Sequence, residues 1–309
     1  MKWAIASIGI CLTSGYAAAQ AVGQKGAIPS PPNTETLVRQ LAPEVRLHSK
    51  DSYRPTSTEW YMQRVHMRLH RKLRSDDQVL NKGQVTPATI ASQNRRGQSS
   101  GGTSRSDFFL QIPNDRDEDT TRKGDLNAAV CYAHTIEGRG YTDIQYWFFY
   151  AYNGDPVIGK SPIKGMKVVG HEGDFEHITV RVVNGKAAHI YYAAHEGGTW
   201  HPASRVMNAE GRPVVYSAHH SHGSFPTAGW SSFDHTDSSG PVWRTWERVE
   251  WVDKTNPTWL NYSGHWGEMG NFEFTSGPYG PKLKDSWVRE APGPGTPAYT
   301  PRARDDRRP

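Results

Sequence analysis

Alternating and continuous apolar segments in the middle of the chain predict β-strands. Residues 177–183 and 186–193 alternate between apolar and polar side chains, and residues 144–152 form a continuous aromatic run. Alternation with a period of two is typical of a half-buried strand, and a bulky aromatic run favours a strand over a helix. Asn184-Gly185 joins the alternating segments, and this dipeptide is a strong signal for a two-residue hairpin. We therefore predict a mainly β fold, a single-domain antiparallel β-sandwich with long loops and minor helix.

The start of the chain has the composition of a signal peptide. Lys2 supplies a positive charge, residues 5–16 are mostly apolar, and residues 17–21 are mostly alanine. We expect residues 1–19 to be removed on export and residues 20–36 to form a leader. The apolar segment is shorter than the about 20 residues that cross a bilayer, so we expect no transmembrane segment and a secreted, extracellular or periplasmic, protein.

The remaining polar segments define the limits of the expected domain. We place one β-sandwich domain at residues 37–290, with flexible loops at 93–106 and 114–125 and a disordered basic tail at 291–309. The formal net charge is +5, and the basic residues are scattered along the chain. Scattered charge favours solubility over recognition of nucleic acid, so we expect no nucleic-acid partner.

Histidine is concentrated in one part of the sequence. Nine of the 14 histidines lie between residues 171 and 235, where glycines and acids separate them. Histidine and carboxylate in one window suit a divalent metal or an acid/base pair. The hydrolase elbow, the zinc-protease helix, the paired-cysteine motif and the dinucleotide fingerprint are all absent from the sequence.

The hairpin predicts which of these residues meet. If Val183 pairs with Lys186 and no bulge intervenes, Asp174 lies opposite His195, with Glu176 on the same face of the sheet. The same register continues that face as core, through Ile178, Val180, Val182 and Tyr191. Two carboxylates this close repel each other unless a cation or a proton lies between them. The alternative interpretation is a set of solvated strand-end charges or structural histidines.

Several segments, in order along the chain, resemble the vacuolar protein sorting-associated protein 62 family. They are residues 41–48, 53–57, 145–150, 173–177, 221–226 and 262–267. The resemblance runs from about Leu41 to Trp287. The family name reflects a trafficking association, which an exported protein cannot share, so the resemblance implies a fold and not an activity.

Residues 170–176, Gly-His-Glu-Gly-Asp-Phe-Glu, also resemble the Gly-His-Arg-His-Asp-Trp-Glu heptapeptide of necrosis- and ethylene-inducing peptide-like proteins. That resemblance implies a β-sandwich toxin fold in which the matching His171, Asp174 and Glu176 hold a divalent cation. The cation would be of the Mg²⁺ or Ca²⁺ type, with Zn²⁺ or Mn²⁺ as alternatives. Gly173 and Phe175 depart from the heptapeptide, which puts cytolytic activity in doubt more than metal binding.

These observations support three hypotheses. The first is a secreted metal-containing protein that binds a glycan or lipid headgroup, as a toxin-like virulence factor. Its expected ligand-binding residues are His195, His219, His222, Asp234, Trp200 and Trp230. The second is a secreted hydrolase of glycosidic or phosphoester bonds, with His195, His222 and Asp174 as its catalytic residues. The third is a structural surface protein without a small ligand.

Overall fold

A computed structural model describes residues 33–71, 75–93, 108–154, 170–195, 197–231, 234–270, 276–290 and 292–293. The expected signal peptide, residues 94–106 of the first expected loop and nearly all of the expected tail lie outside these residues. None of the described helices is long and apolar enough to cross a membrane.

The largest sheet is built on the aromatic and alternating segments. Its strand order is β10-β9-β8-β7-β6-β16, and β2 pairs with β7 as well. The bounds are β2 Pro55–Thr56, β6 Cys131–Gly138, β7 Tyr141–Asn153, β8 His171–Val183, β9 Lys186–Ala194, β10 Gly197–Pro202 and β16 Val249–Trp251. All pairs are antiparallel except β6 with β16. The aromatic run forms most of β7, whose residues Asp143–Ala151 are all buried because both faces of the sheet are covered.

A four-stranded sheet covers one face. Its order is β12-β11-β1-β15, with bounds β12 Ser224–Phe225, β11 Val214–Ser217, β1 Glu44–Arg46 and β15 Val242–Arg244. The ring of Trp243 packs on Phe148 at 5.5 Å between centroids, and the hydroxyls of Tyr150 and Ser217 are hydrogen-bonded at 3.0 Å. Two sheets packed over a shared core confirm the mainly β prediction, although β1 and β11 are parallel.

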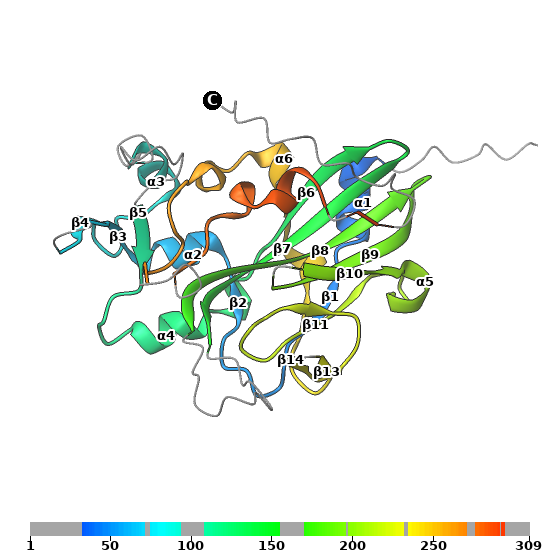
Figure 1. Cartoon of the computed structure of the whole chain (residues 1–309), viewed down its shortest axis with the longest axis horizontal. Helices are drawn as coiled ribbons and strands as arrows, with labels where there is room; N and C mark the ends of the chain where they lie inside the picture. The colour runs from blue at the N-terminus through cyan, green and yellow to red at the C-terminus, as the bar shows by residue number, and fades with distance from the viewer. Residues whose placement is uncertain are drawn as a thin grey trace, which may run out of the picture. The chain divides into compact units, whose positions relative to one another are not determined.

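The opposite face of the large sheet carries a second core. Trp147, Phe149, Phe175, Trp259 and Trp266 pack there. The covering elements are α2 Thr58–Met62, β3 His66–Leu69, β4 Asp77–Leu80, α3 Pro87–Gln93, β5 Phe108–Gln111 and η3 Thr258–Asn261. Figure 1 shows β3, β4 and β5 to the left of the long strands, with β11, β13 and β14 at the lower right. The sandwich therefore has an additional layer, which we did not predict from the sequence.

Short elements complete the described chain. The helices are α1 Thr34–Gln40, α4 Glu118–Lys123, α5 Ala203–Val206, α6 Val252–Thr255, α7 Asp285–Val288, η1 Leu126–Ala128, η2 Thr245–Arg248 and η5 Pro281–Leu283. The strands β13 Gly229–Ser231 and β14 Asp234–Thr236 pair with each other. The helix α1 begins three residues before the expected domain boundary at residue 37.

The charged segment 114–125 is more regular than we predicted. It contains α4, which has acids in its first turn, bases in its last turn and an Arg122–Glu118 ion pair at 2.6 Å. Lys82 bridges Asp115 at 3.0 Å and Asp117 at 2.8 Å. The prediction of a loop is therefore wrong over α4, because the charges that suggested solvation pair with one another.

The hairpin between β8 and β9 has the predicted turn but a different register. Asn184 and Gly185 have φ values of 50° and 72°, and Val183 pairs with Lys186. A bulge then leaves Ala188 unpaired, so that Thr179 faces Tyr191 and Ile178 faces Tyr192. The prediction that Tyr191 shares the core face with Ile178 is wrong, and so is the direct opposition of Asp174 and His195 that the same register required.

Candidate functional site

The first residues of β8 separate two cavities. Glu172 lines one of them, whereas His171 and Asp174 line the other. Between them Gly173 has a φ of +66°, and a Cβ built there would lie 2.3 Å from the carbonyl oxygen of Trp266. Only glycine fits this backbone without displacing Trp266, which explains why this position departs from the histidine of the similar heptapeptide.

We call the larger cavity, which has a volume of about 620 Å³, the histidine cavity. It lies where β9 ends and β10 begins, and residues 276–286 line its other side. Its polar lining includes His171, Asp174, Glu176, His177, His195, His265 and Lys284. The structure thus brings the three predicted metal ligands and His195 to one cavity, although His195 does not lie opposite Asp174.

Asp174 belongs to a buried row of two carboxylates and one imidazole. Its Oδ2 accepts hydrogen bonds from Nδ1 of His222 at 2.9 Å and from Nδ2 of Asn153 at 3.2 Å. On the other side of the imidazole, Oδ2 of Asp51 lies 3.6 Å from Nε2 of His222. Burial alone would raise the pKa of Asp174, but the hydrogen bond and the charge of His222 outweigh it and lower the pKa.

Glu176 is the acid of the histidine cavity with the least compensation. Burial raises its pKa well above the ordinary value, and the charges of Asp174 and Asp234 raise it further. Lys284 offsets part of this effect, while its ammonium group donates to the carbonyl oxygen of Phe175 at 2.8 Å. Within the described part of the chain, no hydrogen bond reaches the Glu176 carboxyl group.

His195 and Asp234 form a dyad at the edge of the histidine cavity. Nε2 of His195 lies 2.8 Å from Oδ2 of Asp234, and the other carboxylate oxygen of Asp234 accepts a hydrogen bond from the Ser221 hydroxyl. The hydrogen bond and the charge of Asp234 raise the pKa of His195, whose side chain is 56% exposed. Because the buried Ser221 hydroxyl faces the carboxylate and not the imidazole, it lacks the base that a nucleophilic serine needs.

The other residues expected to bind ligand do not line the histidine cavity. The ring of Tyr150 stacks on His222 at 3.7 Å and helps to bury it. The ring of His219 stacks on that of His48, with 4.4 Å between their centroids. His235 belongs to the same cluster, because its Nδ1 lies 2.9 Å from Nε2 of His48. The side chain of Trp230, 64% exposed, packs on His235 at 4.5 Å.

Trp200 is outside the lining of the histidine cavity but packs against one of its lining residues, Tyr191. Its ring lies 5.2 Å from that of Tyr191, and the guanidinium of Arg181 is 4.4 Å from its centroid. We did not predict Asp51, His48 or His235 as site residues, although His235 belongs to the histidine-rich segment and His48 to a family-like segment. Asp51 lies between the family-like segments 41–48 and 53–57, which is the one signal that could have drawn attention to it.

The predicted metal ligands have suitable chemistry but are not preassembled. Among the described residues, no three His, Cys, Asp or Glu side chains are arranged to hold a metal ion. His171 uses Nδ1 for the carbonyl oxygen of Gly173 at 2.8 Å, which leaves Nε2, and Asp174 keeps Oδ1. The Glu176 carboxylate adds a third group, so each of the three residues has an atom that can coordinate a metal ion. The donor set fits a hard or borderline divalent cation.

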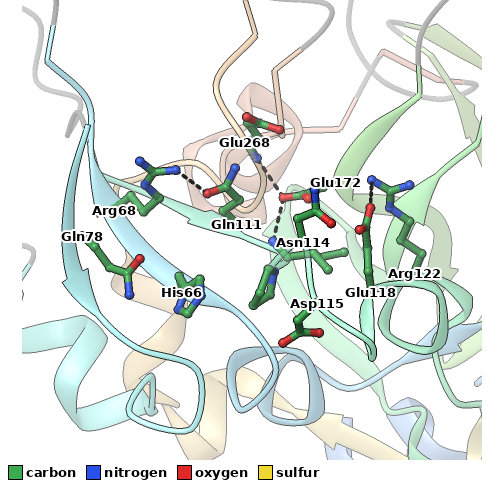
Figure 2. A pocket seen from close by; sticks show the side chains of 12 residues that line it. His66, Arg68, Gln78, Gln111, Asn114, Asp115, Glu118, Arg122, Glu172 and Glu268 are labelled. Atoms are coloured by element: carbon green, nitrogen blue, oxygen red, sulfur yellow. Dashed lines mark hydrogen bonds and ion pairs between the residues drawn. The ribbon is translucent and has the colours of Figure 1, made fainter. Parts of the chain in front are cut away.

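We call the second cavity, which has a volume of about 540 Å³, the amide cavity, and Figure 2 shows its lining. Oε2 of Glu172 accepts hydrogen bonds from the backbone amides of Ile112 at 3.0 Å and Glu268 at 3.2 Å. Burial raises the pKa of Glu172 to about 8, and the charge of Glu268 adds to the shift. Sequence reasoning missed this cavity because its lining comes from segments far apart in the chain.

Comparisons with solved structures return necrosis- and ethylene-inducing proteins. NLPPya in complex with mannosamine is 14% identical, with a TM-score of 0.42, over 86% of this chain and 94% of that one. A protein described as a toxin fold for microbial attack and plant defense is 15% identical, with a TM-score of 0.41, over 85% of this chain and 93% of that one. Necrosis and Ethylene inducing Protein 2 from the causal agent of cocoa's Witches Broom disease is 12% identical, with a TM-score of 0.38, over 84% and 90%.

A search of curated proteins finds no match. The family model of vacuolar protein sorting-associated protein 62 matches residues 19–237. This match includes the first five of the six segments on which the sequence resemblance rests. It also spans β8, β9 and the residues of the His195–Asp234 dyad. The chain belongs to the vacuolar protein sorting-associated protein 62 family.

Proposed function

We propose that this chain is a secreted protein that binds a glycan or a lipid headgroup at the histidine cavity. A divalent cation of the Mg²⁺ or Ca²⁺ type, with Zn²⁺ or Mn²⁺ as alternatives, would be held by His171, Asp174 and Glu176. The observation that carries the proposal is the placement of Glu176. It is a carboxyl group next to Asp174 and Asp234, without a hydrogen bond from the described residues, on a cavity large enough for a ligand.

A cation would remove the electrostatic cost of this arrangement. Carboxylates that share a poorly solvated site repel one another, and a bound cation allows them to coexist in the ionised form. The cation would also present open coordination positions to ligand hydroxyl or phosphate oxygens. His195 at the cavity edge, with a pKa raised by Asp234, would donate a hydrogen bond to the same ligand.

The test compares binding with and without metal. Vesicles of phosphatidylcholine with and without a glycosylated sphingolipid, and an array of neutral glycans, are offered to the wild type and to Glu176→Gln in Ca²⁺, Mg²⁺ or chelator. We expect Ca²⁺ or Mg²⁺ to increase binding over that in chelator, and Glu176→Gln to abolish this increase. Glu268→Gln, which changes an exposed acid of the amide cavity, is the matched control and should bind like the wild type. Equal binding in metal and chelator would overturn the proposal.

The second candidate function is hydrolysis, which the His195–Asp234 dyad favours. An exposed imidazole held by a buried carboxylate is an arrangement that can take a proton from water. Turnover of a panel of polysaccharides and phosphoesters, lost in His195→Gln, would support this alternative. Metal-dependent binding without turnover would favour the first function.

A further inference from the structure

The amide cavity has a lining unlike that of the histidine cavity. Its side chains come from six places in the chain: β3, β4, β5 with the residues that follow it, α4, β8, and the segment that contains Glu268 (Figure 2). The side-chain amides of Gln78, Gln111 and Asn114 lie alongside the guanidinium groups of Arg68 and Arg122. Amides offer both donors and acceptors, so this lining can match hydroxyl groups, which also do both.

The charged groups around the amide cavity are of both signs, and several of them are already engaged. Arg122 bonds to Glu118 at 2.6 Å, and Arg68 donates to the Gln111 amide oxygen at 2.7 Å and to the carbonyl oxygen of Asp76 at 3.2 Å. Asp115 is paired with Lys82 at 3.0 Å. Arg68 bonds to neutral oxygen atoms and keeps its charge, but an anion there would be repelled by the carboxylates of Glu118 and Glu268, which line the same cavity. A cation would be repelled by Arg68 and Arg122. The cavity therefore favours a neutral ligand.

Glu172 provides the second observation that points to a ligand. The residue is only 6% exposed, and both of its hydrogen bonds from backbone amides go to Oε2, as Figure 2 shows. Within the described residues nothing bonds to Oε1, which belongs to a carboxyl group lining the cavity. This oxygen can therefore accept a hydrogen bond from a ligand hydroxyl group.

We infer that the amide cavity is a second binding site, for a neutral and hydroxyl-rich ligand such as one or two saccharide units. The Oε1 atom of Glu172 and the amides of Gln111 and Asn114 would bond to adjacent hydroxyl groups. Its volume of about 540 Å³ lies within the usual range of small-ligand pockets, about 300–1,000 Å³. This site needs no metal, and it is independent of the function proposed for the histidine cavity.

The experiment uses neutral sugars as probes of the full chain in the presence of chelator. Saturation-transfer NMR and calorimetry measure binding of glucose, mannose, galactose and their disaccharides. Asn114 is exposed at the cavity, so its substitution should spare the fold. Asn114→Ala should weaken binding about three- to tenfold, the value of one lost hydrogen bond. Asn114→Phe should block the cavity and abolish binding, whereas the control Asn127→Phe, at an exposed asparagine of η1, should not.

Glu176→Gln separates the two sites, because it should leave sugar binding in chelator unchanged. The inference would be overturned if none of these sugars bound. It would also be overturned if binding survived Asn114→Phe or disappeared in Glu176→Gln. Tighter binding of glucuronate or glucose 6-phosphate than of glucose would identify an anion site instead and would equally contradict the inference.

Discussion

Glu172 and Asp174 are two residues apart on β8, but they line different cavities, and their pKa values are shifted in opposite directions. The pKa of Glu172 is raised to about 8, because burial dominates and only backbone amides bond to the carboxyl group. The pKa of Asp174 is lowered despite its burial, because His222 donates to it. Carboxyl groups whose environments move their pKa values apart are suited to different tasks. Of these two residues, Glu172 is thus the acid that favours the neutral form and Asp174 the acid that favours the charged form.

The largest effect should be on the pH dependence of stability through Glu172. A carboxyl group with a pKa of about 8 in the folded state and 4.5 ordinarily favours folding when protonated. Its contribution is complete below pH 4.5 and is lost as the pH rises to about 8. Glu172→Gln mimics the protonated form, so its stability relative to wild type should rise over this range. One pKa unit is worth about 1.4 kcal/mol, so the full effect is on the order of 5 kcal/mol.

Denaturant unfolding in chelator, at several pH values, measures this difference. Glu268→Gln is the control, because this acid is exposed at the same cavity. A constant difference between Glu172→Gln and wild type from pH 4 to pH 9 would show that Glu172 titrates normally, and the contrast between the two cavities would fail.

Asp174→Ala should cost about 3–5 kcal/mol, because it leaves the buried imidazole of His222 without the carboxylate that it bonds. Asp115→Ala breaks an exposed pair with Lys82 at the amide cavity and should cost much less stability, because solvent screens this pair. Urea unfolding of both variants in chelator checks this difference. Equal losses would mean that the buried row from Asp51 to Asp174 does not stabilise the fold.

Gly173→Ala changes the residue that separates the two cavities. A side chain at a φ of +66° costs about 1–2 kcal/mol, and the approach of 2.3 Å to the Trp266 carbonyl oxygen adds about 1–3 kcal/mol of overpacking. Gly140→Ala is the matched control, because Gly140 has a φ of +84° and no atom within 4 Å of its built Cβ. Thermal unfolding should show Gly173→Ala to be the less stable variant. The reverse order would contradict the close approach to Trp266.

Trp230→Ala should have the smallest effect on stability, below about 0.5 kcal/mol, because the side chain is 64% exposed. If Trp230 contacts the ligand as we predicted from the sequence, glycan affinity should nevertheless fall about tenfold, or about 1.4 kcal/mol. Calorimetry with the best ligand from the glycan array measures this loss. Unchanged affinity would show that Trp230 does not contact the ligand and that the ligand-binding surface does not extend to this residue.

The local features of the fold were predictable from the sequence, whereas the contacts between distant segments were not. Alternation and Asn184-Gly185 gave β8, β9 and their turn, because period and turn chemistry are properties of neighbouring residues. The bulge at Ala188 was missed, since no local pattern encodes it, and it moved Tyr191 to the other face. Pairing of charges in α4 likewise turned an expected loop into a helix.

In the candidate site, too, the residues close in sequence were predictable and the contacts between distant segments were not. His171, Asp174 and Glu176 are close in sequence on one strand, and the heptapeptide resemblance identified them together. His222 was expected at the ligand, but Asp174 and the Tyr150 ring hold it beneath the cavity surface. Asp51, which approaches its other nitrogen, comes from a segment about 170 positions earlier in the chain. Such a partner becomes visible only when the strands are assembled.

A divalent cation bound at the histidine cavity can be detected by its stoichiometry. Calorimetric titration of chelator-treated protein with Ca²⁺, Mg²⁺, Mn²⁺ and Zn²⁺ compares wild type with Glu176→Gln, which spares the hydrogen bond between Asp174 and His222. We expect one high-affinity site in wild type and in Glu268→Gln, and its loss in Glu176→Gln. Absence of binding in the wild type, or equal binding in Glu176→Gln, would contradict this expectation.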